Sequence, residues 1–271
     1  MSERQVARSR VPIISERPRP PCEQLGPASP LRYNGPLADL RGAPRAEPSK
    51  SHPRETPYLT PKSTERLLID GPAGGLEVVV NAPERPLRGI ALIAHPHPLQ
   101  GGTLDNKVAQ TLAKTFFALG YMSVRLNFRG VGRSAGSFDD GIGETDDALA
   151  ALAYAKSSAN ARALPVVLAG FSFGSFVQTR VAKAVAAERL VLVAPAVGRL
   201  DCESVPADTI VIQGEEDDVV PLAAVLAWAR PQELPVVVFP GCGHFFHGRL
   251  VQLQRVLTGM WPGRATVMPG A

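Results

Sequence analysis

The stretch from residue 164 to residue 179 decides the fold, and it reads Leu-Pro-Val-Val-Leu-Ala-Gly-Phe-Ser-Phe-Gly-Ser-Phe-Val-Gln-Thr. A short apolar run leads into Gly170-Phe171-Ser172-Phe173-Gly174, and a helical pattern follows at once. A serine on a sharp strand-to-helix turn is typical of a nucleophile, and the flanking glycines let strand and helix pack tightly. The pattern predicts Ser172 as a nucleophile and the backbone N–H of Phe173 as an oxyanion donor.

A second match to the same pattern, Gly132-Arg133-Ser134-Ala135-Gly136, serves as an internal comparison. The strand expected before it ends at Asn127, too early for a sharp turn, and the residues after it are turn-rich. Ser134 lacks the strand–turn–helix setting, so we expect it not to be the nucleophile. A tight connection without any chemistry is the alternative interpretation of Ser172.

Composition limits the classes of function. The 271 residues, 45% of them hydrophobic, suffice for one sizeable core. Residues 1–62 carry 11 Lys and Arg against 6 Asp and Glu, whereas residues 63–271 carry 18 against 19. The main domain therefore gives no charge basis for binding nucleic acid. The three cysteines form no paired framework, which favours a reducing, cytoplasmic location.

The N-terminal part differs in composition from the rest. Residues 1–62 hold 12 of the 26 prolines and show no apolar period, which predicts a disordered Pro/Arg-rich arm. A solvated tail and an arm that contacts an anionic surface are both open interpretations. We expect a single domain over residues 63–260 and a flexible tail over residues 261–271. No secretory signal and no membrane span are predicted.

The remaining chain alternates strand and helix patterns. Strands are expected at Glu65–Asp70, Gly75–Asn81, Arg88–His95, Tyr121–Asn127, Pro165–Gly170, Leu190–Ala194, Thr209–Gly214 and Pro235–Phe239. Helices are expected at Asp105–Leu119, Glu144–Lys156, Ser175–Ala187, Pro221–Ala229 and from near Gly248. Apolar strands alternating with helices predict an α/β fold with a mostly parallel sheet of about eight strands and helices on both faces. The first two strands have short connections, which allows an antiparallel pair.

A serine nucleophile needs a base and an orienting carboxylate, and in this fold the chain order is serine, acid, histidine. Four carboxylates, Glu215-Glu216-Asp217-Asp218, follow one predicted strand, and His244 closes the glycine-rich loop after the last one. Both groups stand at carboxyl ends of strands, where sites of open α/β sheets lie. His244 is favoured over His247, which stands near a helix start. Spacing alone does not choose among the four carboxylates.

Two further histidines, His95 and His97, suggest a different chemistry. Together with His244 and His247 they would supply enough imidazoles for zinc. However, no His-Glu-x-x-His run is present, and the simpler interpretation is that His95 packs the turn while His97 lines the pocket. We therefore expect no metal and no cofactor.

These residues together carry a family resemblance. Five segments resemble those of the α/β-hydrolase superfamily. They are Gly170–Gly174, Ala94-His95-Pro96-His97-Pro98-Leu99-Gln100-Gly101-Gly102, and the segments 125–134, 213–221 and 241–246. The similarity is to small lidless bacterial hydrolases related to dienelactone hydrolases, and it covers about residues 64–258. The resemblance implies that Asp217, three residues after Gly214, is the acid and that His97 supplies the second oxyanion N–H. Asn127 stands where many relatives have Asp, at a position that shapes a turn.

The substrate cleft is expected to be open. Only 14 residues, Pro195 to Asp208, separate two predicted strands at the point where many superfamily members insert a cap domain. An open cleft favours small acyl compounds as partners. The expected lining residues are Leu99, Gly101, Phe171 and Phe245, with Phe173 and Phe246 as further aromatics, although ordinary core packing is an equal alternative.

The sequence thus predicts a serine hydrolase that cleaves a small ester, thioester or amide through an acyl-enzyme. The alternatives are a binding protein that kept the fold, because fold alone does not imply activity, and an acyltransferase with the same triad. The sequence does not indicate an oligomeric state.

Overall fold

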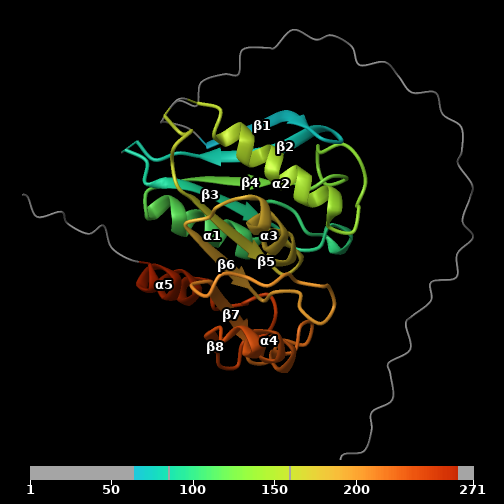
Figure 1. The fold of residues 1–271 in the computed structure, drawn as a ribbon, viewed down its shortest axis with the longest axis vertical. Helices are drawn as coiled ribbons and strands as arrows, with labels where there is room; N and C mark the ends of the chain where they lie inside the picture. The colour runs from blue at the N-terminus through green and yellow to red at the C-terminus, as the bar shows by residue number, and fades with distance from the viewer. Residues whose placement is uncertain (1–63, 85, 159, 262–271) are drawn as a thin grey trace, which may run out of the picture. The chain divides into compact units, whose positions relative to one another are not determined.

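The computed structural model describes residues 64–84, 86–158 and 160–261, and contains one mixed sheet of eight strands (Figure 1). The predicted arm and nearly all of the predicted tail lie outside the described residues. The strands are β1 (Thr64–Gly71), β2 (Gly74–Asn81), β3 (Gly89–Ala94), β4 (Tyr121–Leu126), β5 (Val166–Phe171), β6 (Arg189–Val193), β7 (Ile210–Gly214) and β8 (Val236–Phe239).

The order across the sheet is β1-β2-β4-β3-β5-β6-β7-β8. β2 is antiparallel to both of its neighbours, and all pairings from β4 to β8 are parallel. Every residue of β3, β4 and β5 is buried, as expected for strands covered on both faces. The prediction of a mostly parallel sheet with an early antiparallel pair is confirmed.

Helices cover both faces of the sheet. They are α1 (Lys107–Ala118), α2 (Ile142–Ala155), α3 (Phe173–Ala184), α4 (Leu222–Ala229) and α5 (Leu250–Met260). One apolar core includes buried residues of α2, α3 and α4, and a second core on the opposite face includes those of α1 and α5. Figure 1 shows α2 and α3 in front of the sheet, with α1 behind it.

Each helix begins one or two residues from its predicted start, and side-chain hydrogen bonds explain two of these differences. Glu144 was expected to open α2, but its carboxylate accepts the N–H groups of Asp139 and Gly141, so the helix starts two residues earlier, at Ile142. The side chain of Asn106 accepts the N–H groups of Val108 and Ala109, and α1 therefore begins at Lys107.

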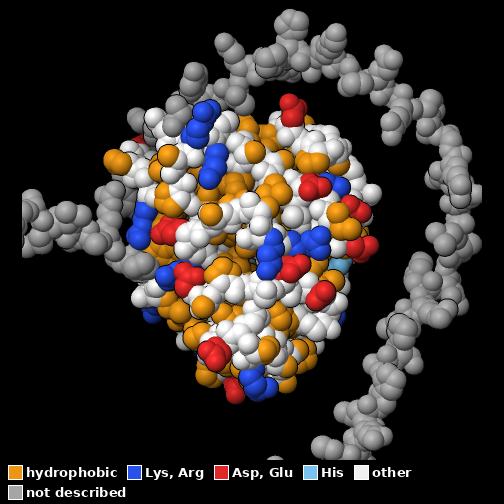
Figure 2. Space-filling model, in the orientation of Figure 1, with side chains coloured by type: hydrophobic (Ala, Val, Ile, Leu, Met, Phe, Trp, Pro, Cys, Tyr) orange, Lys and Arg blue, Asp and Glu red, His pale blue; other side chains and the backbone are white. Residues whose placement is uncertain are grey.

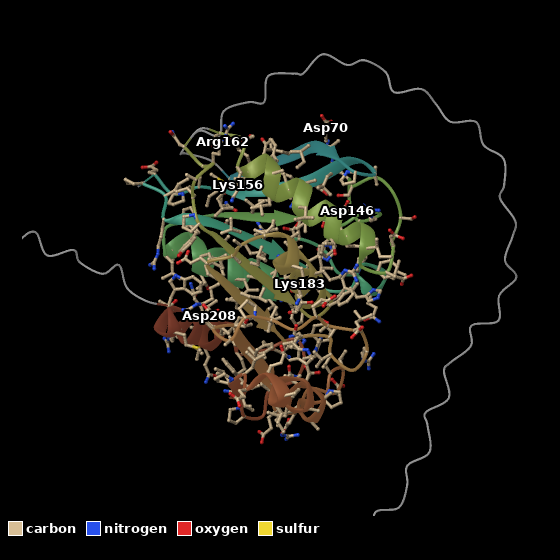
Figure 3. The ribbon with its side chains drawn as sticks, viewed as in Figure 1. Asp70, Asp146, Lys156, Arg162, Lys183 and Asp208 are labelled. Carbon is tan, nitrogen blue, oxygen red and sulfur yellow. The ribbon has the colours of Figure 1, made fainter. Side chains whose placement is uncertain are left out.

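Charged groups of both signs are interspersed on the visible face (Figure 2). Figure 3 labels three acidic and three basic side chains spread over this face: Asp70, Asp146, Lys156, Arg162, Lys183 and Asp208. None of the helices in the described ranges combines the length and the hydrophobicity needed to cross a membrane.

Candidate active site

Ser172 occupies the strained turn between β5 and α3. Its backbone has φ 55° and ψ −117°, a conformation that costs a non-glycine residue on the order of 1–3 kcal/mol. A Cβ on Gly170 would overlap the carbonyl of Gly174, and one on Gly174 would overlap the carbonyl of Ala94. The two glycines therefore let β5, α3 and the end of β3 come together, and the turn holds Ser172 at the carboxyl edge of the sheet.

The acidic loop after β7 turns one of its four carboxylates inward. Asp217 is buried, whereas Glu215, Glu216 and Asp218 are exposed. Oδ1 of Asp217 accepts the N–H groups of Val219 and Val220, at 2.9 and 2.7 Å. Burial raises the pKa of Asp217, but hydrogen bonds from His244 and these two N–H groups outweigh it, so the pKa lies below its ordinary value. The carboxylate is held ionised near neutral pH.

His244 joins this carboxylate to the serine. Its Nδ1 lies 2.8 Å from Oδ2 of Asp217, and its Nε2 lies 3.0 Å from Oγ of Ser172. The ring of Phe171 packs against the imidazole, with 5.0 Å between ring centroids. With Nδ1 donating to the carboxylate, Nε2 is left to accept the serine proton, which is the arrangement of a nucleophile, a base and an orienting acid.

The loops that carry Asp217 and His244 are bonded to each other. The N–H of Glu216 donates to the carbonyl of Cys242 at 3.0 Å, and the N–H of Gly241 donates to the Glu215 carboxylate at 2.9 Å. A Cβ on Gly214 would overlap the same Cys242 carbonyl. These contacts fix the position of the carboxylate relative to the imidazole.

A loop after β3 lies next to the serine turn. The rings of His97 and Phe173 are 5.1 Å apart, and His97 precedes a short 3-10 helix, Pro98–Gln100. Phe173 is the first residue of α3, where a backbone N–H has no acceptor within the helix. The structure thus brings together the two residues whose N–H groups the sequence and the resemblance select as oxyanion donors.

His95 anchors this loop. Its Nδ1 lies 2.6 Å from the carbonyl oxygen of Pro96, and its Nε2 accepts the N–H of Phe128. Burial lowers the pKa of His95 to about 4, although the hydrogen bond to Pro96 acts in the opposite direction. The Pro96 carbonyl belongs to the same peptide group as the His97 N–H, so His95 also orients that N–H.

The predicted lining residues separate into two groups. Leu99 is 72% exposed and Phe245 is 47% exposed, and Gly101 is also exposed, with φ 76°. Phe171 and Phe246, in contrast, are fully buried. The expectation that these two line the cleft is therefore wrong, because both belong to the core on the α1 and α5 face, where the Phe171 ring packs against that of His244. The side chain of Phe173, the other expected aromatic, is 1% exposed and belongs to the core on the opposite face.

Ser134, the comparison serine, is bonded to backbone groups. It donates to the carbonyl of Asn127 at 2.7 Å and accepts the N–H of Glu77 at 3.0 Å. The side chain of Asn127 accepts the N–H of Leu104 and donates to the carboxylate of Glu77. Both residues shape the turn after β4.

Gln213 contacts the site but was not predicted from the sequence. This buried side chain donates through Nε2 to Oδ2 of Asp217 and to the carbonyl of Val220, each at 2.8 Å. It stands inside an apolar strand, directly before the glycine that ends it, and this isolated polar residue is the signal that was available. Gln213 thus holds the carboxylate of Asp217, which also contacts His244.

The four histidines of the described residues do not form one cluster. Both ring nitrogens of His95 face backbone groups, and His244 contacts Asp217 and Ser172. Across residues 64–84, 86–158 and 160–261, no three His, Cys, Asp or Glu side chains form a group suited to a metal ion.

The chain is similar to several known proteins. Residues 70–206, half of the chain, match the model of the family described as X-Pro dipeptidyl-peptidase (S15 family). The chain belongs to this family of α/β hydrolases. The chain is also 34% identical over 171 residues to an uncharacterised protein of Rickettsia prowazekii. This match spans 57% of this chain and 68% of the other.

Similar solved structures indicate which type of α/β hydrolase the chain is. It is 39% identical to an α/β serine hydrolase without a lid from Xanthomonas campestris, with a TM-score of 0.69 over 74% of this chain and 95% of that one. The sequence identity is also 39% to an α/β serine hydrolase homologue from Coxiella burnetii, with a TM-score of 0.67 over 74% of this chain and 99% of that one. In agreement, residues 194–209, between β6 and β7, contain no helix. The chain is a hydrolase of the lidless α/β serine hydrolase type.

Proposed function

We propose that this hydrolase cleaves a small ester, thioester or amide with a triad formed by Ser172, Asp217 and His244. The observation that carries the proposal is the continuous chain of contacts from the serine oxygen through the imidazole to the carboxylate, at 3.0 and 2.8 Å. Both distances are within hydrogen-bond reach, which general-base activation of a serine requires.

The proposed reaction has two stages. His244 takes the proton of Ser172 as the serine oxygen attacks the substrate carbonyl, and the N–H groups of Phe173 and His97 stabilise the oxyanion. The imidazole then gives its proton to the leaving group. Water, deprotonated by the same imidazole, attacks the acyl-enzyme. The bond from the acyl carbon to the Ser172 oxygen breaks, the acid leaves, and the imidazole returns the proton to the serine. Asp217 keeps the ring oriented and stabilises its charged form. No step requires a metal or an organic cofactor.

The absence of a cap supports a substrate that an open surface can hold. Leu99 and Phe245 are exposed apolar side chains on the two loops that flank the triad. We propose that they contact the apolar part of a short acyl substrate, and that Gly101 lets the substrate approach the backbone. The core aromatics Phe171 and Phe246 have no part in this contact.

Labelling by a fluorophosphonate probe tests the proposal. We expect the full chain to be labelled in a 1:1 ratio at Ser172, labelling to be lost in Ser172→Ala, and labelling to persist in Ser134→Ala. Unlabelled wild-type protein, or labelling that persists in Ser172→Ala, would contradict the triad.

A substrate panel then addresses the acyl group and the acceptor. It compares p-nitrophenyl acetate, a p-nitrophenyl ester of a long fatty acid, an acyl thioester and an X-Pro p-nitroanilide, the last because of the family description. We expect the short ester to be turned over faster than the long one. Transfer of the acyl group to an added alcohol in preference to water would identify an acyltransferase.

A further inference from the structure

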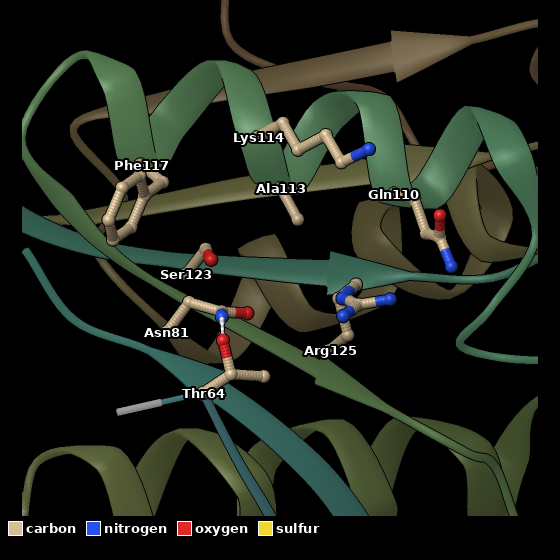
Figure 4. A pocket seen from close by; sticks show the side chains of 8 residues that line it. All are labelled: Thr64, Asn81, Gln110, Ala113, Lys114, Phe117, Ser123 and Arg125. Carbon is tan, nitrogen blue, oxygen red and sulfur yellow. Dashed lines mark hydrogen bonds between the residues drawn. The ribbon is translucent and has the colours of Figure 1, made fainter. Parts of the chain in front are cut away.

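A cavity of about 370 Å³ lies between α1 and the sheet, and none of its lining residues belongs to the triad or to the loop after β3 (Figure 4). This volume is within the range of roughly 300–1,000 Å³ that is usual for small-molecule sites. Helix α1 contributes one wall, and β1, β2 and β4 contribute the other. The lining residues are Thr64, Asn81, Gln110, Ala113, Lys114, Phe117, Ser123 and Arg125.

Two buried polar side chains in this cavity have atoms without partners. Ser123 is 1% exposed and Arg125 is 9% exposed. Within the described residues, Oγ of Ser123 and Nε of Arg125 have no hydrogen-bond partner. Leaving a buried donor or acceptor unpaired costs about 1–3 kcal/mol, so two such atoms in one cavity are a feature that a ligand would explain.

The two side chains are also placed in a fixed geometry. Ser123 and Arg125 stand two residues apart on β4 and therefore project from the same face of the sheet. Nη1 of Arg125 donates to the carbonyl of Leu104 at 2.8 Å and lies 3.4 Å from the carboxylate of Asp105. One end of the guanidinium is thus anchored to the protein, while its Nε is left for another acceptor.

The charge of the lining favours an anion. Lys114 and Arg125 are cations, and the lining includes no carboxylate. Burial lowers the pKa of Arg125, the carboxylate of Asp105 raises it, and the nearby charge of Arg66 lowers it. Asp105 is shared, because its carboxylate also pairs with Arg66 at 2.6 Å. A bound anion would place a further negative charge beside Lys114 and Arg125.

We propose that this cavity binds a small organic anion, a carboxylate or a phosphate monoester, at a site separate from the triad. The acidic group accepts hydrogen bonds from Ser123, Arg125 and Lys114. The amide nitrogen of Asn81 donates to Thr64 and that of Gln110 to Asp105, and the second N–H of each is a further donor at the edge. The apolar part of the ligand lies against Ala113 and Phe117, two positions of α1 that are four residues apart and hence on one helix face.

Calorimetric titration of the full chain with benzoate, phenyl phosphate and benzyl alcohol tests this site. We expect one of the two anions to bind and the neutral alcohol not to bind, and the stronger anion identifies the acidic group. Lys114→Glu should weaken binding by about tenfold or more, equivalent to about 1.4 kcal/mol. Lys107→Glu, the same change two turns away on α1, should weaken it less than about threefold. No binding by either anion, or equal losses in the two variants, would overturn the proposal.

A second variant, Ser123→Ala, distinguishes an effect on anion binding from an effect on folding. Ser123→Ala removes a hydroxyl without a partner, so the melting temperature of the unliganded protein should stay the same or rise. Its affinity for the anion should fall by about three- to tenfold, the effect of one lost hydrogen bond. Ser175→Ala is the matched control, because its buried hydroxyl is bonded to the carbonyls of Gly170 and Val193 and its loss should lower the melting temperature. A similar drop in Ser123→Ala, or unchanged affinity, would mean that the hydroxyl serves the fold alone.

Discussion

The Nε2 atom of His95 accepts the backbone N–H of Phe128 at 3.1 Å, across 33 residues of sequence. Its other ring nitrogen, Nδ1, contacts the carbonyl oxygen of Pro96, which accepts and does not donate. Both contacts are satisfied only by a neutral ring that carries its proton on Nδ1. A second proton on Nε2 would remove the acceptor that Phe128 uses, so the loop after β3 and the turn after β4 are joined through one protonation state.

Acidification should therefore destabilise the protein through His95. Burial lowers the folded-state pKa to about 4, against an unfolded value of about 6.5, so the unfolded state binds more protons between these values. The contribution is complete above about pH 6.5 and falls as the pH drops to about 4, by on the order of 3 kcal/mol. Urea unfolding at several pH values measures it. His95→Gln should flatten this dependence and His97→Gln should retain most of it; an unchanged slope in His95→Gln would contradict the assignment.

The inward carboxylate should matter more than its neighbour. Asp217→Asn is expected to lower kcat by about 10²–10⁴-fold, because an amide leaves the wrong imidazole tautomer facing the serine. Asp218→Asn, the same change on an exposed side chain one residue away, should have a small effect. Steady-state kinetics on a short ester provide the comparison. Equal losses would show that the loop as a whole, and not one carboxylate, is required.

Gln213 should act as a positioning residue. In Gln213→Leu, Asp217 loses one hydrogen bond and gains freedom to turn away from His244, so we expect kcat to fall by about tenfold with little change in KM. Gln178→Leu is the matched control: Gln178 is also fully buried and also donates through Nε2 to two groups, the carbonyls of Leu92 and Ala169. Both variants should lose stability, but only Gln213→Leu should lose kcat. A parallel loss in both would assign Gln213 a structural role.

The two serines of the repeated motif should separate catalysis from stability. Ser134→Ala removes hydrogen bonds to Glu77 and Asn127 and should lower the free energy of unfolding by about 1–3 kcal/mol, while ester turnover by the folded protein persists. Ser172→Ala should abolish turnover and leave the melting temperature close to that of the wild type. The reverse pattern would move the nucleophile to Ser134.

A chelator should leave the activity unchanged. Both ring nitrogens of His95 face backbone groups, so zinc ligation would require the loop to break two hydrogen bonds. Activity before and after dialysis against EDTA, with zinc measured by elemental analysis, checks this expectation. Stoichiometric zinc together with loss of activity on its removal would support the histidine-based alternative.

Local pattern was sufficient for most of the sheet because its central strands are buried on both faces. Gly89–Ala94 and Val166–Phe171 are therefore nearly continuous apolar runs, bounded by turn residues. The serine turn was equally visible, since it demands small residues at fixed offsets from Ser172. In these segments the local sequence and the tertiary structure impose the same requirement.

Other features depend on contacts between distant segments. Gln213 is a partner of Asp217 only because the loop after β7 folds back over its own strand. Phe171 is adjacent to Ser172 in sequence, yet the turn directs it into the core, which no periodicity reveals. The unpaired atoms of Ser123 and Arg125 are evident only once α1 and β2 lie beside β4.

The bonds between the Glu215–Asp218 loop and the Gly241–His244 loop have a mechanical consequence. The proposed acid and base, Asp217 and His244, are carried by two loops that are bonded to each other, whereas Ser172 stands between β5 and α3. Thermal motion that displaces the imidazole takes the carboxylate with it, so the gap that opens first is the one between Nε2 and the serine oxygen. On warming, we therefore expect activity to be lost when the two loops move away from the serine turn, at temperatures below the unfolding of the sheet.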